Sequence, residues 1–315
     1  MDLDKKFEDL FVKVSVKAAL ASFNFIGKKD KIAADKAAVD AMRTELNKIE
    51  MNGEVVIGEG ELDEAPMLYI GEKLGTMKGK SIDIAVDPLE GTNFAANNLP
   101  GALSVIAVAE KSNLFNAPET YMNKISANIQ EKDVIDLDYT VKKNIYNLAD
   151  YKNKKPENLT VCILDRPRHQ KIIEELTNLN VNLKLISDGD VSGALLVTEE
   201  KYGVDLFLGI GGGPEGVLAA SALDTYNCYF QGRFLFETDK DKLRANKMGI
   251  KDLKKKYMLS EIITGDSIFC ATGITTGDLV SGIQIENKEF ISETLITHKS
   301  SNLKKIIRTK EKILI

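Results

Sequence analysis

The chain has 315 residues and a formal net charge of -5, and 43% of its residues are hydrophobic. This composition is typical of a globular protein with about two domains, and its acidic balance argues against an overall basic surface for nucleic acid. Its three cysteines, Cys162, Cys228 and Cys270, form no closely spaced pair, and it has only two histidines. A disulfide framework and a thiolate zinc site are therefore not expected, and a site built on several histidines is excluded.

The beginning of the sequence, MDLDKKFEDL, has no basic region followed by an apolar region, so no signal peptide is predicted. No apolar run approaches the ~18 residues that a membrane-spanning helix needs. We therefore expect a cytoplasmic protein with no membrane partner and no nucleic-acid partner.

Two helices are predicted first, over residues 7–23 and 30–49. In the second helix, Asp35 lies three residues before Ala38, on the apolar stripe that continues to Ile49. A carboxylate on that stripe faces the rest of the fold, where burial is costly unless the group is paired or binds a metal. Asp35 is therefore a candidate metal ligand.

Short apolar strands and helices then alternate. Strands are predicted over residues 55–57, 82–86 and 103–109, and a helix is predicted from Pro66 to about residue 75. The strand over 82–86 is expected to end at Asp87, because the proline that follows disfavours continuation of a central strand.

In the second half, the predicted strands cover residues 160–164, 183–186, 205–208 and 268–271. The predicted helices cover residues 169–179, 191–197 and 214–223, and residues 280–307 resemble a β-hairpin with a further strand. Alternating β and α elements predict a layered α/β protein. The polar segment over residues 150–158 suggests two domains, 1–155 and 156–315.

The most informative feature is a set of carboxylates at strand and helix ends. Glu59, Asp87 and Glu90 follow predicted strands, and Glu215 follows another strand at the start of a helix. Loops at strand ends are where α/β folds assemble their sites. Converging carboxylates repel one another unless hard divalent cations lie among them, and all-oxygen ligands suit Mg²⁺ or Mn²⁺.

Such a site suits phosphoryl transfer to water, which two or more cations would assist. Alternatively, these acids, Glu59 and Asp35 among them, are solvated loop residues and helix caps. That alternative is weak for DPLEGT, where an apolar strand, a proline, two acids, a glycine and a hydroxyl occur together.

A resemblance to the metal-binding signature of the lithium-sensitive phosphatases, which include inositol monophosphatases and fructose-1,6-bisphosphatases, is carried by DIAVDPLEGT. A closer resemblance to class II fructose-1,6-bisphosphatases is carried by VIGEGELDEAPMLYIGEKLG, LFNAPETYM, DRPRH, SDGDV, GIGGGPEGV and FCATGITTGDL. These motifs run in the family's order from about residue 25 to about residue 300. The resemblance implies a layered sugar-phosphatase fold of two α/β sub-domains with the active site between them.

The resemblance also implies roles for the acids. Asp35 and Glu59 match the ligands of one metal, and Asp87, Glu90 and Glu215 match the ligands of a second. These are the carboxylates that the residue types indicate independently.

Three catalytic residues are implied in the same way. Thr92 matches the hydroxyl that orients the attacking water, and Asp63 matches an acid that activates it. Asp63 is alternatively an N-cap ahead of Pro66. Lys31 is a candidate phosphate contact, although an exposed lysine is the common alternative.

The implied substrate contacts come from several motifs. Arg166 and Arg168 match the groups that hold the phosphate that is not cleaved, since guanidinium forks suit phosphate geometry. The Asp188–Asp190 turn resembles the family's sugar-binding turn, and Tyr121 matches a ring that contacts the substrate. Taken alone, the arginines are ordinary surface residues, the turn is only a turn and the tyrosine is packing. The full implied set is Glu90, Gly91, Thr92, Tyr121, Arg166, Pro167, Arg168, Asp188, Gly189, Asp190 and Gly212.

The run from Gly209 to Gly213 lacks the glycine spacing of a dinucleotide-binding motif, because Pro214 and Glu215 follow it. It is interpreted as a phosphate-facing or metal-facing turn. Two departures from the family pattern are present: GKKDKIAAD near Lys31, and NFAANNLPGAL after DPLEGT in place of a loop rich in arginine or threonine.

The implied reaction is hydrolysis of the 1-phosphate of fructose 1,6-bisphosphate to fructose 6-phosphate and phosphate, in gluconeogenesis. The implied assembly is a homo-oligomer, a dimer or a tetramer. The alternatives are a phosphatase for sedoheptulose 1,7-bisphosphate or an inositol phosphate, and a sugar-phosphate-binding regulator without turnover.

Overall fold

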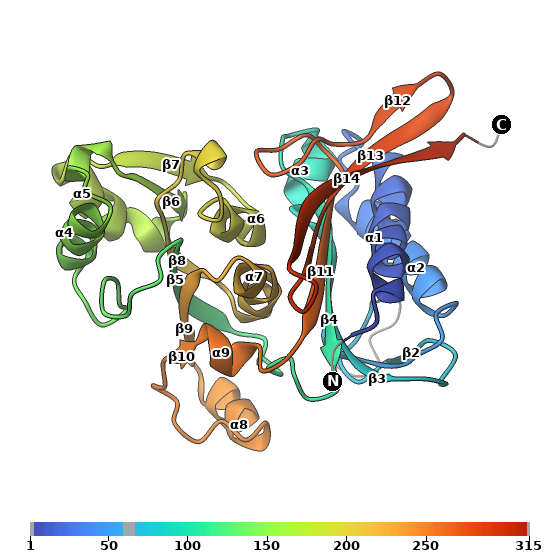
Figure 1. Ribbon diagram of the computed structural model, residues 1–315, viewed down its shortest axis with the longest axis horizontal. Coiled ribbons are helices and arrows are strands. Elements are labelled where there is room, and N and C mark those ends of the chain that lie inside the picture. The colour runs from blue at the N-terminus through green and yellow to red at the C-terminus, as the bar shows by residue number, and fades with distance from the viewer. Residues whose placement is uncertain (1–2, 59–66, 314–315) are drawn as a thin grey trace. The chain divides into compact units, whose positions relative to one another are not determined.

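The computed structural model describes residues 3–58 and 67–313. The chain forms two compact units, one of Met1–Asn116 with Ile263–Ile315 and one of Ala117–Ile262 (Figure 1). The division expected at residue 155 thus lies inside the second unit, and the C-terminal segment belongs to the first. The reason is long-range strand pairing, because β11 (Ser267–Gly273) pairs antiparallel with β4 (Leu103–Glu110) along its whole length.

The first unit is built on an eight-stranded sheet in the order β12-β13-β11-β4-β3-β1-β2, with β14 beside β13. Its pairings are antiparallel except for β1 with β3. The remaining strands of this sheet are β1 (Asn52–Ile57), β2 (Lys73–Leu74), β3 (Ser81–Glu90), β12 (Gln284–Glu286), β13 (Glu289–His298) and β14 (Leu303–Lys312). The hairpin and further strand predicted near the C-terminus are confirmed.

Helices α1 (Lys6–Phe23) and α2 (Lys31–Leu46) lie beside this sheet (Figure 1). In α1, the fully buried Phe7, Phe11 and Ala18 recur at helical spacing, and the helix contacts β3, β4, β11 and β13. Burial of this stripe stabilises the docking of α1 on the sheet. Both predicted helices are confirmed, and α2 ends three residues before the predicted end.

The helix predicted from Pro66 to about residue 75 is not formed in the described part, residues 67–75. Residues Lys73–Leu74 instead form β2, which pairs antiparallel with β1. Gly71 and Gly75 have φ values of 93° and 91°, a left-handed conformation that interrupts a helix. The pairing of Gly53 with Leu74 holds this segment at the edge of the sheet.

Strand β3 extends past its predicted end, through Pro88 to Glu90. The register of β3 on β4 shifts between Asp87 and Glu90. Such an irregularity lets a strand continue past a proline, because the residue without an N–H falls where the ladder is interrupted.

The second unit holds a six-stranded sheet in the order β10-β9-β5-β8-β6-β7. Its strands are β5 (Tyr121–Ala127), β6 (Thr160–Leu164), β7 (Asn182–Ile186), β8 (Leu206–Gly212), β9 (Tyr229–Leu235) and β10 (Tyr257–Met258). Its helices are α4 (Val141–Tyr151), α5 (Gln170–Asn178), α6 (Asp190–Leu195), α7 (Gly213–Thr225), α8 (Asp239–Lys247) and α9 (Leu259–Ile262). Single 3-10 turns cover Pro156–Asn158, Pro167–His169 and Glu200–Tyr202.

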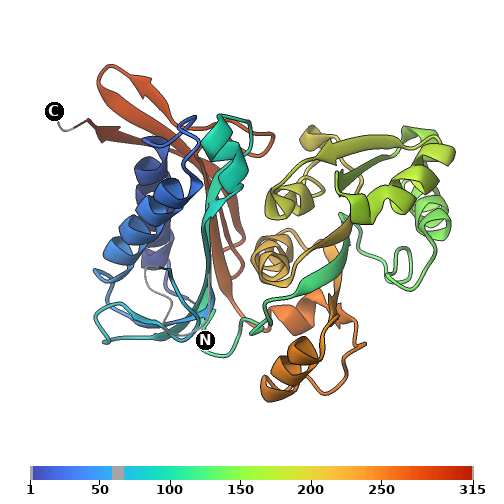
Figure 2. The ribbon, with the colours of Figure 1, turned by 180° about the vertical axis from the view of Figure 1, so that it is seen from behind.

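Helices α4 and α5 lie on one face of the second sheet and α6 and α7 on the other, as the opposite view also shows (Figure 2). The α4 side holds an apolar core that includes Ile125, Ile145, Val161 and Leu206. Because side chains alternate along a strand, the neighbours of Ile125 on β5 face α6 and α7. This second face carries the charged residues described below. The layered α/β class predicted from the sequence is confirmed, and no helix in the described ranges has the length and apolarity to cross a bilayer.

Candidate active site

The DPLEGT motif lies where β3 of the first unit ends. Asp87 and Glu90 both belong to the strand, and Glu90 is only 4% exposed. Strand β1 runs parallel to β3 and ends at Ile57, which pairs with Ala85, so the carboxyl ends of both strands lie at one edge of the sheet. Glu59 follows β1 by two residues and lies outside the described residues.

The turn after β3 depends on Gly91. Its φ of 77° is left-handed, and a Cβ there would lie 2.8 Å from the ring of Phe94. Thr92 follows as the first residue of α3 (Thr92–Asn97), and the Phe94 N–H donates to the Gly91 carbonyl at 2.8 Å. The segment that departs from the family pattern therefore begins as a short helix, with the Thr92 hydroxyl two residues beyond Glu90.

Asp35 and Lys31 are both carried by α2. Asp30 caps this helix by accepting a hydrogen bond from the Ala33 N–H at 3.0 Å. The helix contacts β3 and α3, which carry DPLEGT. Asp35 is partly buried and its Oδ1 atom is inaccessible to solvent, whereas Lys31 is exposed. The helix stripe thus brings a carboxylate, but not the lysine, into the packed interior.

The predicted cation ligands come from both units. Within residues 3–58 and 67–313, no three Asp, Glu, His or Cys side chains gather closely enough to be recognised as a metal site. Glu59 and the predicted catalytic Asp63 lie outside these residues. The donor set is nonetheless entirely carboxylate, and Oε2 of Glu215 is buried with no hydrogen-bond partner among the described residues. Carboxylate oxygens are the ligands that a hard divalent cation prefers, and a cation satisfies a buried oxygen of this kind.

In the second unit, the predicted substrate residues meet at the end of β8. The Arg168 guanidinium lies 4.8 Å from the centre of the Tyr121 ring, and its Nε donates to the Ile210 carbonyl at 3.0 Å. Arg166 Nη2 lies 3.7 Å from Asp188 Oδ1. Three separate motifs therefore place their side chains in one region of the second unit.

A buried histidine positions the arginine segment. Pro167 opens the 3-10 turn after β6, and His169 closes it. The His169 Nε2 atom accepts from the Ile210 N–H at 2.7 Å, so its Nδ1 donates to the Leu164 carbonyl, also at 2.7 Å. Burial lowers the pKa of His169, which keeps the ring neutral in this bridge. Sequence reasoning did not assign His169 a role.

The DGD turn is held by a residue that sequence reasoning missed. Gly189 has a φ of 78°, and Asp190 opens α6. Asp190 Oδ2 accepts from the ammonium of Lys124 on β5, which is 1% exposed. The available signal was a lone charge in the strand YMNKISA, where Lys124 shares its strand face with the uncharged Met122 and Ser126.

The glycines of GIGGG make room for two carboxylates. A Cβ on Gly211 would lie 1.8 Å from Asp190 Oδ2, and a Cβ on Gly212 would lie 1.8 Å from Glu215 Oε2. The run forms the end of a strand that leads directly into α7. A role facing phosphate or metal stays a prediction. Burial raises the pKa of Glu215, Asp190 raises it further, and Lys124 opposes them.

A cavity of about 420 Å³ opens beside these groups. Tyr121, Gly212 and Glu215 line it, together with Thr238 and Asp241 at the start of α8. Its volume is that of a small-ligand site, and its lining includes four acids, Glu119, Glu215, Glu237 and Asp241.

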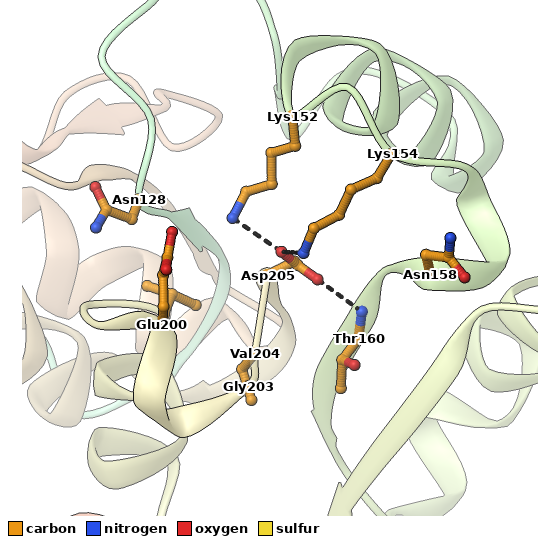
Figure 3. Close-up of a pocket in the computed structure, with 10 residues that line it drawn as sticks. Asn128, Lys152, Lys154, Asn158, Thr160, Glu200, Gly203, Val204 and Asp205 are labelled. Atoms are coloured by element: carbon orange, nitrogen blue, oxygen red, sulfur yellow. Dashed lines mark hydrogen bonds and ion pairs between the residues drawn. The ribbon is translucent and has the colours of Figure 1, made fainter.

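A second cavity of the same unit, about 600 Å³, lies at the other end of β8 (Figure 3). Asp205 Oδ1 accepts from Lys152 at 2.9 Å and Lys154 at 2.8 Å, and Oδ2 accepts from the Thr160 N–H at 3.0 Å. None of the predicted site residues lines this cavity. We interpret its charged cluster as a structural clamp.

Comparison with known proteins gives consistent matches. A family model described as bacterial fructose-1,6-bisphosphatase, glpX-encoded, matches residues 5–311. The Escherichia coli (strain K12) protein named fructose-1,6-bisphosphatase 1 class 2 is 41% identical, covering 94% of this chain and 92% of its own. A Synechococcus protein named D-fructose 1,6-bisphosphatase class 2/sedoheptulose 1,7-bisphosphatase is 37% identical, covering 98% of this chain and 96% of its own.

Proposed function

Because the chain belongs to the glpX-encoded bacterial fructose-1,6-bisphosphatase family, we propose that it hydrolyses the 1-phosphate of fructose 1,6-bisphosphate, giving fructose 6-phosphate and phosphate. The match covers nearly the whole chain, so it includes both units. One structural observation carries the assignment of the substrate side: Tyr121, Arg168, Asp190 and Glu215 meet where β8 ends.

We assign cation binding to Asp35, Glu59, Asp87, Glu90 and Glu215, with Mn²⁺ or Mg²⁺ as the ions. The all-carboxylate donor set and the unsatisfied buried oxygen of Glu215 support this assignment. Bound divalent cations supply electrophilic stabilisation of the charge that develops on the phosphoryl and leaving oxygens. The chain's own groups bind and orient the substrate around them.

For the proton transfers, the Thr92 hydroxyl orients the attacking water and Asp63 accepts its proton. Thr92 is suited to this role because a threonine hydroxyl accepts one hydrogen bond while it donates another. Lys31, exposed at the first position of α2, is assigned to the phosphate that is cleaved.

The rest of the substrate is assigned to the second unit. Arg166 and Arg168 hold the phosphate that remains, through planar forks of N–H donors. Asp188 and Asp190 accept hydrogen bonds from sugar hydroxyls. The stacking of Arg168 on Tyr121 supports this arrangement, because it fixes the plane of the guanidinium.

The test is phosphate release by the purified chain from fructose 1,6-bisphosphate with Mn²⁺ or Mg²⁺, with inositol phosphate as a control. We expect turnover that a chelator abolishes. Turnover of inositol phosphate alone would overturn the substrate assignment, and sugar-phosphate binding without any phosphate release would favour a regulator.

Sedoheptulose 1,7-bisphosphate is a second candidate substrate, favoured by the double name of the Synechococcus relative. The two bisphosphates present the same functional groups, so kcat/KM should be measured for both. We place the reaction in cytoplasmic gluconeogenesis, in a homo-oligomer that is a dimer or a tetramer; size-exclusion chromatography with light scattering would test the assembly.

A further inference from the structure

Lys124 occupies a position where a lysine is costly. It lies in the middle of β5, with Gly209 of β8 and Gly232 of β9 as its cross-strand neighbours. Among the described residues it is the only lysine that is fully buried. Burying an ammonium group costs several kcal/mol unless hydrogen bonds and opposite charge compensate it.

The contacts of Lys124 lead directly to the site. Its Nζ donates to Asp190 Oδ2 and to the Gly212 carbonyl, the latter at 2.6 Å. A Cβ on Gly211 would lie 3.2 Å from this nitrogen, so the absence of a side chain there leaves room for the ammonium. Lys124 thus joins the DGD turn to the last residue of β8.

The surroundings explain why this charge matters. Asp190 and Glu215 lie along the same glycines, since a Cβ on Gly211 would lie 1.8 Å from Asp190 Oδ2 and a Cβ on Gly212 would lie 1.8 Å from Glu215 Oε2. Lys124 is the cation that bonds to Asp190 and to the Gly212 carbonyl there. Without it, Asp190 would be a buried carboxylate beside two other acids, and mutual repulsion would favour its movement away from Gly211.

We propose that Lys124 is a positioning residue for substrate recognition: it holds Asp190 by one oxygen so that the other accepts a sugar hydroxyl. This inference rests on the proposed function. The carboxylate is oriented before the substrate arrives, so binding does not have to order it. Lys124 itself does not touch the substrate.

The test is a double-mutant cycle with Lys124→Met, Asp190→Asn and the pair together. Methionine keeps the length of the four-carbon stem of lysine and removes the ammonium group with its charge. We expect Lys124→Met to raise KM for fructose 1,6-bisphosphate about tenfold, as for coupled residues in contact, while kcat changes by less than about threefold. In the Asp190→Asn background the same change should have almost no further effect on KM.

The double variant also protects the test against misfolding. Removing both charges takes away the Lys124–Asp190 pair without leaving either partner charged and unpaired, so the double variant should remain folded even if Lys124→Met does not. Its KM, compared with that of Asp190→Asn alone, then decides. If the fold-increases in KM of the two single variants multiplied in the double variant, the positioning role would be overturned. A fall in kcat with KM unchanged would also overturn it.

A readout without turnover completes the test. Calorimetric binding of fructose 6-phosphate to the metal-free chain should weaken in Lys124→Met and be equally weak in Asp190→Asn and the double variant. Lys201→Met, which removes an exposed lysine paired with Glu199 in the same unit, is the matched control and should leave KM unchanged.

The two proposals fail in different ways. If the wild-type chain is active and the two substitutions change KM independently of each other, only the positioning role is overturned. A wild-type chain that neither hydrolyses fructose 1,6-bisphosphate nor binds fructose 6-phosphate would overturn both.

Discussion

At the scale of single residues, the carboxylates of β3 differ sharply in what surrounds them. Asp83 lies within the strand, 3% exposed, and accepts from the Ser112 N–H at 2.6 Å. Asp87 lies four residues further along, in the DPLEGT motif at the irregular end of the strand. The same residue type therefore fills a structural position and a candidate functional position on one strand.

This contrast provides a first prediction. Asp87→Asn should lower kcat for fructose 1,6-bisphosphate by about 100-fold or more, the order seen when one charge-stabilising group is lost from a transition state. Asp83→Asn is the matched control and should reduce the free energy of unfolding while leaving kcat nearly unchanged. Full activity in Asp87→Asn would refute the assigned role, and steady-state phosphate release measures both variants.

Arg168 provides a second prediction at this scale. Arg168→Met should raise KM by roughly 10- to 100-fold, the value of a charge-assisted hydrogen bond, with a smaller change in kcat. Arg308→Met is the control, because Arg308 is an exposed arginine in the first unit that pairs with Glu286. If both variants kept the wild-type KM, Arg168 would not be a phosphate contact.

At the scale of elements, the second sheet is held at one end by Asp205. The residue precedes β8, and its carboxylate accepts from two lysines that follow α4 and from the first N–H of β6. Burial would raise the pKa of Asp205, but Lys154, Lys152 and the Thr160 N–H outweigh it and lower the pKa. One side chain thus connects a helix end to two strands.

We expect Asp205→Asn to lower the free energy of unfolding by about 1.5–3 kcal/mol, the contribution of hydrogen bonds to a charged group. Glu286→Gln breaks an exposed ion pair and should cost no more than about 1 kcal/mol. Chemical denaturation at pH 7 measures both. An equal small effect in the two variants would contradict the role of Asp205 as a clamp.

At the scale of the whole molecule, the two histidines give opposite pH dependences. His298 is fully buried. Its Nδ1 atom lies 2.5 Å from Glu8 Oε1 and its Nε2 atom lies 3.0 Å from Asp266 Oδ2. These contacts join α1, which carries Glu8, to the C-terminal strands. Burial lowers the pKa of His298, but the hydrogen bonds that the ring donates to Asp266 and Glu8 outweigh it, so the pKa is raised. Burial raises the pKa of Asp266, but its hydrogen bonds with His298 and with the Leu3 and Ser300 N–H groups outweigh burial and lower the pKa to about 2.

A base whose pKa is raised by folding stabilises the protein fully below its unfolded pKa and less as pH rises through the folded value. Wild-type stability should therefore fall as pH rises above 6.5. In His298→Gln this decline should be weaker, and the free energy of unfolding at pH 6 should be about 3–5 kcal/mol lower because a buried pair is broken. Denaturation between pH 5 and pH 9 measures the slopes.

His169 is the matched comparison, because folding lowers its pKa. Its contribution is present above pH 6.5 and is lost as pH falls below that value, so His169→Gln should flatten the acid side of the profile. Identical pH profiles for the two variants would contradict both assignments.

The sequence alone determined the layered α/β class, most of the helices and strands, and the motifs that carry the chemistry. These are local signals: helical spacing in α1, apolar strands, and the turn chemistry around Gly91 and Gly189. These signals can be read from the sequence because the 3.6-residue period of a helix, the 2-residue period of a strand and a left-handed turn all depend on residues that are neighbours in the chain.

The tertiary structure decided what depends on residues far apart in the chain. The return of β11 to β4 set the limits of the two units, and the pairing of residues 73–74 with β1 overrode a helical pattern. The role of Lys124 emerged only when β5, α6 and β8 came together, because burial and ion pairing are properties of packed neighbours. Such contacts leave no period in the sequence, and only the fold brings their partners together.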